Sequence, residues 1–238
     1  MSEADPLHRP DSIFAETLSF RETVLTRRSV RRFRPDPVPG ALLRTILAEA
    51  QRSPSNCNTQ PWVTHIVSGD VRDRLGATFD AAWTGQQFTP DFSFAQDAYQ
   101  GDCTTRLKQQ GATYFESMGV GRGDAVARDA LLRQNFDFYG APHAAFLFMR
   151  SVGDNVRAAA DVGMYAQTLL LSLVAHGLGG IPQTAFGLFA DPVRRELGVS
   201  EDFKLLFGIS FGYADDDAVG ASYRTDRAAL EEAVVFHG

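Results

Sequence analysis

Two short stretches near the start of the chain decide how the sequence is interpreted: Arg27-Arg28-Ser29-Val30-Arg31 and Pro54-Ser55-Asn56-Cys57-Asn58-Thr59-Gln60-Pro61-Trp62. The first stretch places three guanidinium groups and a hydroxyl within five residues. This pattern suits a phosphate or an anionic, planar ligand, because arginine binds such groups through paired hydrogen bonds. A solvated run of charge is the ordinary alternative. The second stretch can hydrogen-bond the edge of a heterocycle, or it can be a common helix-to-strand loop.

Regular structure is expected on both sides of these stretches. A short helix is expected from Phe20 to Arg28. An amphipathic helix around residues 42–50 is indicated by the spacing of its apolar side chains, and it ends at Ser53-Pro54. The β-branched run Trp62–Ser68 predicts a strand.

The second half of the chain has clearer periodicity than the middle. Residues 143–149 predict a buried strand, and residues 155–176 predict a long helix that is apolar around much of its circumference, as at a core or a subunit interface. Large and small residues alternate strictly over 207–213, which predicts a strand. Asp191 and Pro192 are typical of the N-cap and first position of a short helix that Gly198 ends.

Residues 70–138 are mostly helical in character, with helix boundaries that the pattern does not define. The aromatic side chains in this region predict either a lid over a flat substrate or a peripheral apolar cluster: Phe79, Trp83, Phe88, Phe92, Phe94 and Tyr99. Residues 1–19 are polar and predict an N-terminal arm, and residues 20–238 predict a single α+β domain.

Composition limits the functional classes. The net charge of −6 disfavours a nucleic-acid partner, since phosphates would be repelled. The two cysteines form no CxxC motif and the five histidines show no metal-ligand spacing, so neither a disulfide nor a metal site is expected. The chain shows no signal-peptide pattern, and its most apolar run, Met164–Ala175, is short and interrupted by polar residues. These features predict a soluble, cytoplasmic protein without a membrane partner.

Taken together at their spacing, the two opening stretches resemble the start of the nitroreductase family. The resemblance extends to Gly180-Ile181-Pro182-Gln183-Thr184, where the family places a flavin-edge loop, and to Tyr223-Arg224-Thr225-Asp226-Arg227, where it places basic residues on the FMN phosphate. It covers residues 20 to 230, and residues 70–135 match the family least. The Gly-x-Pro-Gln-Thr-Ala variant and the aromatic insertion are similar to the nitrobenzoate- and nitrophenol-reducing branch.

The resemblance implies roles for individual residues. Arg27, Arg28, Ser29 and Arg31 would hold the ribityl phosphate and the pyrimidine side of a non-covalent FMN, with Arg224 and Arg227 on the phosphate. A second subunit would contribute Pro54, Ser55, Asn56 and Asn58. The flavin edge would be lined by Asn135, Pro182, Gln183, Thr184 and Ala185. Weaker candidates for the substrate pocket are Trp83, Phe88 and Tyr99.

The resemblance also implies a mixed central sheet flanked by helices, in an intertwined homodimer with both flavins at the interface. NADH or NADPH would give a hydride to flavin N5, and a small planar acceptor such as a nitroaromatic or a quinone would then be reduced in the same place, by a ping-pong mechanism. No side chain need act as an acid or a base. Alternatives with the same fold are enone reduction, dehalogenation, heterocycle dehydrogenation and flavin breakdown. Alternatives of another class are a flavin carrier or sensor and a polyanion-binding module.

Overall fold

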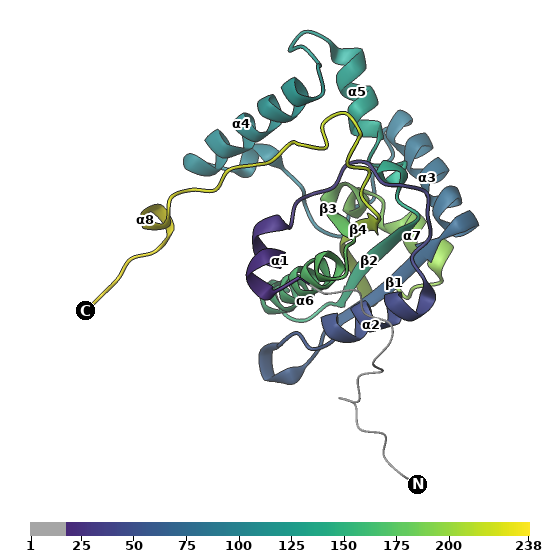
Figure 1. Ribbon diagram of the computed structural model, residues 1–238. Coiled ribbons are helices and arrows are strands. Elements are labelled where there is room, and N and C mark those ends of the chain that lie inside the picture. Colours follow the sequence, from purple (N-terminus) through teal and green to yellow (C-terminus); the bar gives the residue numbers. More distant parts are fainter. Residues whose placement is uncertain (1–17) are drawn as a thin grey trace.

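A four-stranded sheet forms the centre of the molecule in the computed structural model, which describes residues 18–238 (Figure 1). The strand order is β1 (Trp62–Ser68), β2 (His143–Arg150), β4 (Phe203–Gly212) and β3 (Gly179–Gln183). The predicted N-terminal arm, residues 1–19, lies outside the described residues except for its last two. The α+β class is confirmed, and β1 has the bounds that its sequence predicts.

The sheet differs from the expected mixed arrangement, because each pair of neighbouring strands is antiparallel. Among the described residues, parallel pairing outside the strands is limited to two isolated bridges, Ser29 to Gly180 and Thr89 to Phe189. Each of these segments pairs over one residue only, too short to add a strand. Even so, both bridges attach a segment of the candidate site to the core of the domain.

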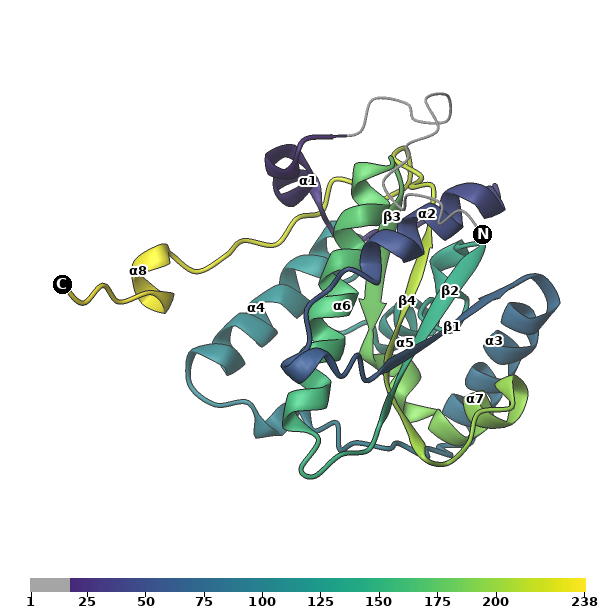
Figure 2. The same cartoon turned by 90° about the horizontal axis from the view of Figure 1, so that it is seen from below.

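Helices cover both faces of the sheet (Figures 1 and 2). One face packs against α2 (Gly40–Ala50) and α6 (Val156–Ala175), and the other against α3 (Gly69–Thr84) and α7 (Ala190–Leu197). The alternation along β4 follows these layers, since Ile209 and Phe211 join the α2–α6 core while Gly208 lies against Phe186 of the opposite core. The periodicity of the sequence therefore reports correctly which face each β4 residue occupies.

The predicted long helix is confirmed as α6, with Asn155 and His176 as its caps. Of the helices in the described residues, α6 alone is long and apolar enough to cross a membrane, a test that buried core helices also pass. The short helix α7 begins at Ala190, with Phe189 as N-cap, so the expected N-cap role of Asp191 is wrong. Asp191 instead lies in the first turn, where its carboxylate binds Arg194. Gly198 ends α7 in a left-handed conformation, as expected.

The poorly patterned middle of the chain forms two helices that stand away from the sheet, α4 (Asp102–Ser117) and α5 (Ala125–Arg133) (Figure 1). After β4 the chain runs past α4 and away from the body of the molecule to α8 (Leu230–Ala233) (Figures 1 and 2). An ion pair of 2.9 Å between Arg106 on α4 and Glu232 on α8 connects the two helices. The other helical elements are α1 (Phe20–Thr26), η1 (Asn56–Asn58), η2 (Gln96–Ala98), η3 (Phe138–Gly140) and η4 (Thr184–Leu188).

We expect Gly208→Ala to destabilise the fold by about 1–3 kcal/mol, the usual cost of overpacking a core. A Cβ atom at this position would lie 2.6 Å from a ring carbon of Phe186 and 3.0 Å from the carbonyl oxygen of Ala145. Urea denaturation measures the loss. Gly121→Ala is the matched control, because a Cβ there meets nothing within 4 Å. Equal stability of the two variants would contradict the close packing of β4 against η4.

Candidate functional site

The arginine-rich stretch is fixed to the edge of the sheet beside β3. The backbone of Ser29 forms a parallel bridge with Gly180, and the Val30 amide donates to the Gly180 carbonyl at 3.3 Å. A Cβ atom on Gly179 would lie 2.5 Å from Val30 Cγ2, so this close approach requires glycine. The sequence neighbours of Ser29 are thereby held next to the Gly180–Gln183 segment, which was expected to be a loop and is a strand.

A small pocket, about 80 Å³, joins this stretch to the end of the chain. The family resemblance assigned both segments to the FMN phosphate, and the structure brings them together. The pocket is lined by Arg27, Arg28, Ser29, Arg31, Tyr223, Arg224, Thr225 and Arg227. A phosphate in such a pocket can accept charge-assisted hydrogen bonds from several guanidinium groups at once.

The guanidinium groups in this pocket repel one another. Burial and the nearby charge of Arg227 lower the pKa of Arg27. Burial and the charge of Arg28 likewise lower the pKa of Arg224, although Asp216 acts in the opposite direction. Asp216 is ion-paired with Arg28, but its side chain is 77% exposed and so neutralises the cluster poorly. The pocket is therefore built to accept an anion, and it fits a phosphate.

A larger cavity, about 1230 Å³, opens beside this pocket and contains the predicted flavin-edge residues. Its inner wall is formed by Arg31, Asn135, Tyr139, Ile181, Pro182, Gln183, Thr184 and Ala185. Its outer wall comes from the end of α3, the segment that follows α3, α4, the connection between α4 and α5, and α5. This wall includes Trp83, Phe88, Phe94, Lys108, Tyr114, Phe115, Arg122 and Arg128. Apolar walls with a few polar groups at one end are typical of sites for planar ligands.

Gln183 holds the inner wall together rather than offering a free amide. Its Nε2 donates to the carbonyl oxygen of Asn135 at 3.0 Å and to the Asn135 side chain at 3.2 Å. Its Oε1 accepts a hydrogen bond from the Ser210 hydroxyl. Two residues that the sequence nominated separately, Gln183 and Asn135, are thus directly connected. We interpret Gln183 as a residue that positions Asn135 at the cavity.

Arg31 is held by aromatic rings that sequence reasoning did not assign to the site. Its guanidinium carbon lies 4.8 Å from the centre of the Tyr114 ring and 5.4 Å from that of Tyr223. Burial raises the pKa of Tyr114. The Tyr114 hydroxyl oxygen is also buried, with no hydrogen-bond partner among the described residues. Such an orphaned group beside a cavity is expected to bind a polar atom of a ligand.

The loop that contains Pro54, Ser55, Asn56 and Asn58 lies elsewhere on the same chain and lines neither cavity. The Asn56 amide donates to both carboxylate oxygens of Asp161, at 3.1 and 3.2 Å, which anchors the loop to α6. Cys57 and Asn58 have positive φ values of 51° and 56°, so the backbone is held in an uncommon conformation. The expected contact from a second subunit stays a prediction.

The predicted aromatic lid is partly correct. Trp83 and Phe88 line the large cavity, with ring centres 5.7 Å apart. Tyr99, the third substrate candidate, is half exposed and does not line the cavity. Phe79 is fully buried in the core, where it stacks on Phe189 at 4.9 Å. The aromatic run therefore divides between the cavity wall, the core and the surface.

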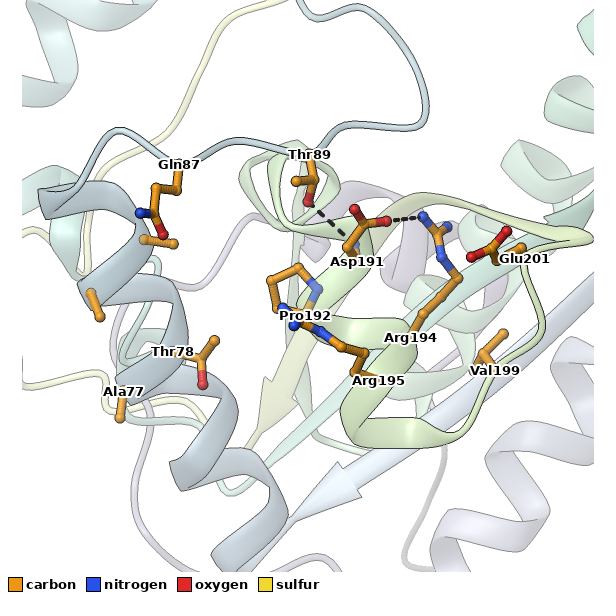
Figure 3. A pocket seen from close by; sticks show the side chains of 12 residues that line it. Ala77, Thr78, Gln87, Thr89, Asp191, Pro192, Arg194, Arg195, Val199 and Glu201 are labelled. Atoms are coloured by element: carbon orange, nitrogen blue, oxygen red, sulfur yellow. Dashed lines mark hydrogen bonds and ion pairs between the residues drawn. The ribbon is translucent and has the colours of Figure 1, made fainter.

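A separate hollow, about 790 Å³, lies between α3 and α7 (Figure 3). None of the site residues nominated from the sequence lines it. Figure 3 shows Arg194 turned toward Asp191, which in turn lies beside Thr89. Two carboxylates, those of Asp91 and Asp191, engage this arginine, so Arg195 is the single cation without an ion pair among the described residues that line the hollow.

Comparisons with known proteins agree with this geometry. The model of the nitroreductase family matches residues 24–213. The chain is 42% identical over 210 residues to nitroreductase NfnB of Mycolicibacterium smegmatis, covering 88% of this chain and 89% of that protein. It is 30% identical over 224 residues to 4-nitrobenzoate reductase of Pseudomonas putida, covering 93% and 97%.

Solved structures give the same result. The FMN-dependent nitroreductase NfnB from Mycobacterium smegmatis, in complex with NADPH, superposes with a TM-score of 0.88 at 40% identity, over 92% of this chain and 97% of that chain. The FMN- and NADPH-dependent nitroreductase NfnB from Sphigopyxis sp. strain HMH gives a TM-score of 0.89 at 33% identity, over 93% and 100%. The likeness therefore extends over nearly the whole of each chain.

Proposed function

Because the chain belongs to the nitroreductase family, we propose that it is an FMN-dependent oxidoreductase that transfers electrons from NADPH or NADH to a small, planar, electron-poor acceptor. A nitroaromatic compound or a quinone is such an acceptor. The proposal is supported by relatives whose names include FMN, NADPH or 4-nitrobenzoate. The observation that carries it is the arginine-lined anion pocket beside an aromatic-walled cavity.

In this proposal the cofactor phosphate binds in the small pocket and the flavin ring lies along the inner wall of the large cavity. The phosphate is held by Arg27, Arg28, Ser29, Arg224 and Arg227, and the ring contacts Arg31, Asn135, Pro182, Gln183, Thr184 and Ala185. Pro54, Ser55, Asn56 and Asn58 reach the ring from a second subunit. When bound, FMN accepts a hydride from the nicotinamide and passes electrons to the acceptor.

The protein's part is to bind, orient and supply charge. Arg31, which lies against the rings of both Tyr114 and Tyr223, places a permanent cation at the cavity wall, and this cation stabilises negative charge on a group bound there. The cavity of about 1230 Å³ exceeds the roughly 300–1000 Å³ of most small-molecule sites. It therefore has room for a ring system and a second planar ligand. One such space used in turn by donor and acceptor supports ping-pong kinetics.

The working unit in this proposal is a homodimer with the cofactor at the interface. Several large apolar side chains in the terminal segments are exposed on the single chain, and a partner subunit would cover them: Phe20, Leu25, Leu230, Val235 and Phe236. The C-terminal segment also runs away from the body of its own chain (Figures 1 and 2). The cytoplasmic location and the absence of a nucleic-acid or membrane partner stay predictions.

The visible absorption spectrum of the purified protein tests the proposed function directly. We expect a yellow protein whose colour bleaches on anaerobic addition of NADPH or NADH and returns when a nitroaromatic compound is added. A protein that stays colourless after incubation with FMN would contradict the cofactor and its residues. A yellow protein that neither nucleotide bleaches would keep the cofactor site and point to a flavin carrier.

A further inference from the structure

Two separate groups of cationic side chains border the proposed site. The first, in the small pocket, is the one assigned to the cofactor phosphate. The second lies at the outer end of the large cavity, on α4 and on the segment that leads into and through α5, and consists of Lys108, Arg122 and Arg128. None of these three lines the small pocket. A single phosphate in the first pocket therefore leaves the second group without an anion.

The charge of the large cavity contrasts with that of the whole protein. The chain has a net charge of −6, with 29 acidic against 23 basic side chains. Yet the charged residues among the described residues that line this cavity are Arg31, Lys108, Arg122 and Arg128, with no aspartate or glutamate. A concave wall of one sign, in a protein of the opposite net charge, attracts and orients anionic ligands.

The outer cations are also free to bind. Within residues 18–238, no ion pair involves Lys108, Arg122 or Arg128. Arg128 is oriented but not neutralised, since its Nε donates to the Gly121 carbonyl at 3.2 Å and its guanidinium lies 4.4 Å from the centre of the Phe115 ring. Its terminal nitrogens have no hydrogen-bond partner among the described residues, so they are available to an incoming ligand.

The surroundings of these cations define the ligand. Phe115 beside Arg128, and Trp83, Phe88 and Phe94 along the same cavity, offer flat apolar surfaces. Rings stack on such surfaces, whereas a small inorganic ion gains nothing from them. The occupant is therefore a molecule with a planar body and an anionic group placed away from the inner wall.

On these grounds we infer that Lys108, Arg122 and Arg128 form a second anion subsite, which binds a phosphate or carboxylate attached to the planar ligand that reacts in the cavity. The inference rests on the proposed function and extends it to ligand selection. Two sources supply this chemistry: the 2′-phosphate that distinguishes NADPH from NADH, and a carboxylate on an aromatic acceptor. In either case the subsite selects among ligands and has no part in holding FMN.

The test is the Arg122→Gln, Arg128→Gln double variant in its flavin-loaded form. Each lost charge-assisted contact is expected to raise KM by about tenfold or more for a ligand with the anion. If the nucleotide is the source, KM rises for NADPH and not for NADH. If the acceptor is the source, KM rises for 4-nitrobenzoate and not for nitrobenzene. Calorimetry gives an independent readout of affinity. If the nucleotide is the source, the double variant binds adenosine 2′-phosphate more weakly and adenosine equally well. If the acceptor is the source, it binds benzoate more weakly and benzamide equally well.

The matched control is Arg195→Gln, which removes an exposed guanidinium that lines the hollow between α3 and α7 (Figure 3). The inference is overturned if the double variant and this control have the same KM for NADPH, NADH, 4-nitrobenzoate and nitrobenzene. The two would then also have the same affinity for adenosine 2′-phosphate, adenosine, benzoate and benzamide. That result differs from a failure of the proposed function, in which the wild-type protein itself would bind no FMN or would not bleach. Equal weakening of charged and neutral ligands would also overturn the subsite, since it would indicate a deformed cavity.

Discussion

The Arg27→Gln, Arg227→Gln double variant is expected to be purified without flavin. The two guanidinium groups line the same pocket from opposite ends of the chain. A hydrogen bond to a charged group contributes about 1.5–3 kcal/mol, so losing two weakens FMN binding by roughly 10²–10⁴-fold. Titration of the flavin-free protein with FMN, followed by quenching of flavin fluorescence, measures the change.

The stability of the flavin-free protein distinguishes a lost ligand contact from a damaged fold. Burial and mutual repulsion lower the pKa of Arg27, which means that the folded apoprotein disfavours its charge. We therefore expect the double variant, without flavin, to be at least as stable as the wild-type apoprotein. Inorganic phosphate should raise the Tm of the wild-type apoprotein and leave that of the variant unchanged. FMN affinity equal to that of Arg195→Gln would exclude this pocket as the phosphate site.

The candidate site residues were nominated from local signals in the sequence. The Arg27–Arg31 stretch, the polar loop at 54–62 and the terminal arginines are contiguous motifs, and the structure joins the first of these to the last in one pocket. The strand at 62–68 and the helix at 155–176 follow from residue type and period, which need no knowledge of distant partners. A local motif does not predict which other motif lies beside it in the folded chain. The loop at 54–62, for example, lines neither cavity of its own chain.

Other features depend on contacts between distant segments. Gly180–Gln183 was expected to be a loop because the family resemblance places a flavin-edge loop there, but the segment forms β3 at the edge of the sheet, where Pro182 is tolerated. Arg31 gains its aromatic partners from α4 and from the segment after β4. No residue of α4 is buried in the single chain, so packing against the rest of this chain does not mark where the helix begins and ends. The outer cations on α4 and near α5 were missed for the same reason.

The second large effect is expected at Asp91, whose side chain is only 5% exposed and is bound to Arg194, itself 9% exposed, at 2.5 Å. The same carboxylate oxygen accepts the Leu205 amide at 2.7 Å. Asp91→Ala leaves a buried guanidinium and a strand amide without this partner. Removing one member of a buried ion pair typically costs about 3–5 kcal/mol, a large part of the stability of a domain. Urea denaturation of the variant measures the loss.

Asp191 provides the matched control, because its carboxylate binds the same guanidinium at 2.5 Å but is 54% exposed. Asp191→Asn should cost about 1 kcal/mol or less, as is usual for exposed pairs. Similar losses in the two variants would mean that the guanidinium itself, and not burial of Asp91, sets the stability of this region.

The position of Asp91 connects this stability to the proposed reaction. Two hydrogen bonds of Thr89 attach the segment around Asp91 to the core. The Thr89 amide donates to the Leu188 carbonyl at 2.9 Å. The Thr89 hydroxyl accepts a hydrogen bond from the Asp191 amide at 3.3 Å (Figure 3). Phe88 and Phe94, on either side of Asp91, line the large cavity. Loosening this anchor should therefore raise KM for aromatic acceptors while FMN, held by arginines elsewhere, stays bound. If the variant instead lost FMN while its KM for the acceptor stayed unchanged, the segment around Asp91 would support the cofactor site and not the wall that contacts the acceptor.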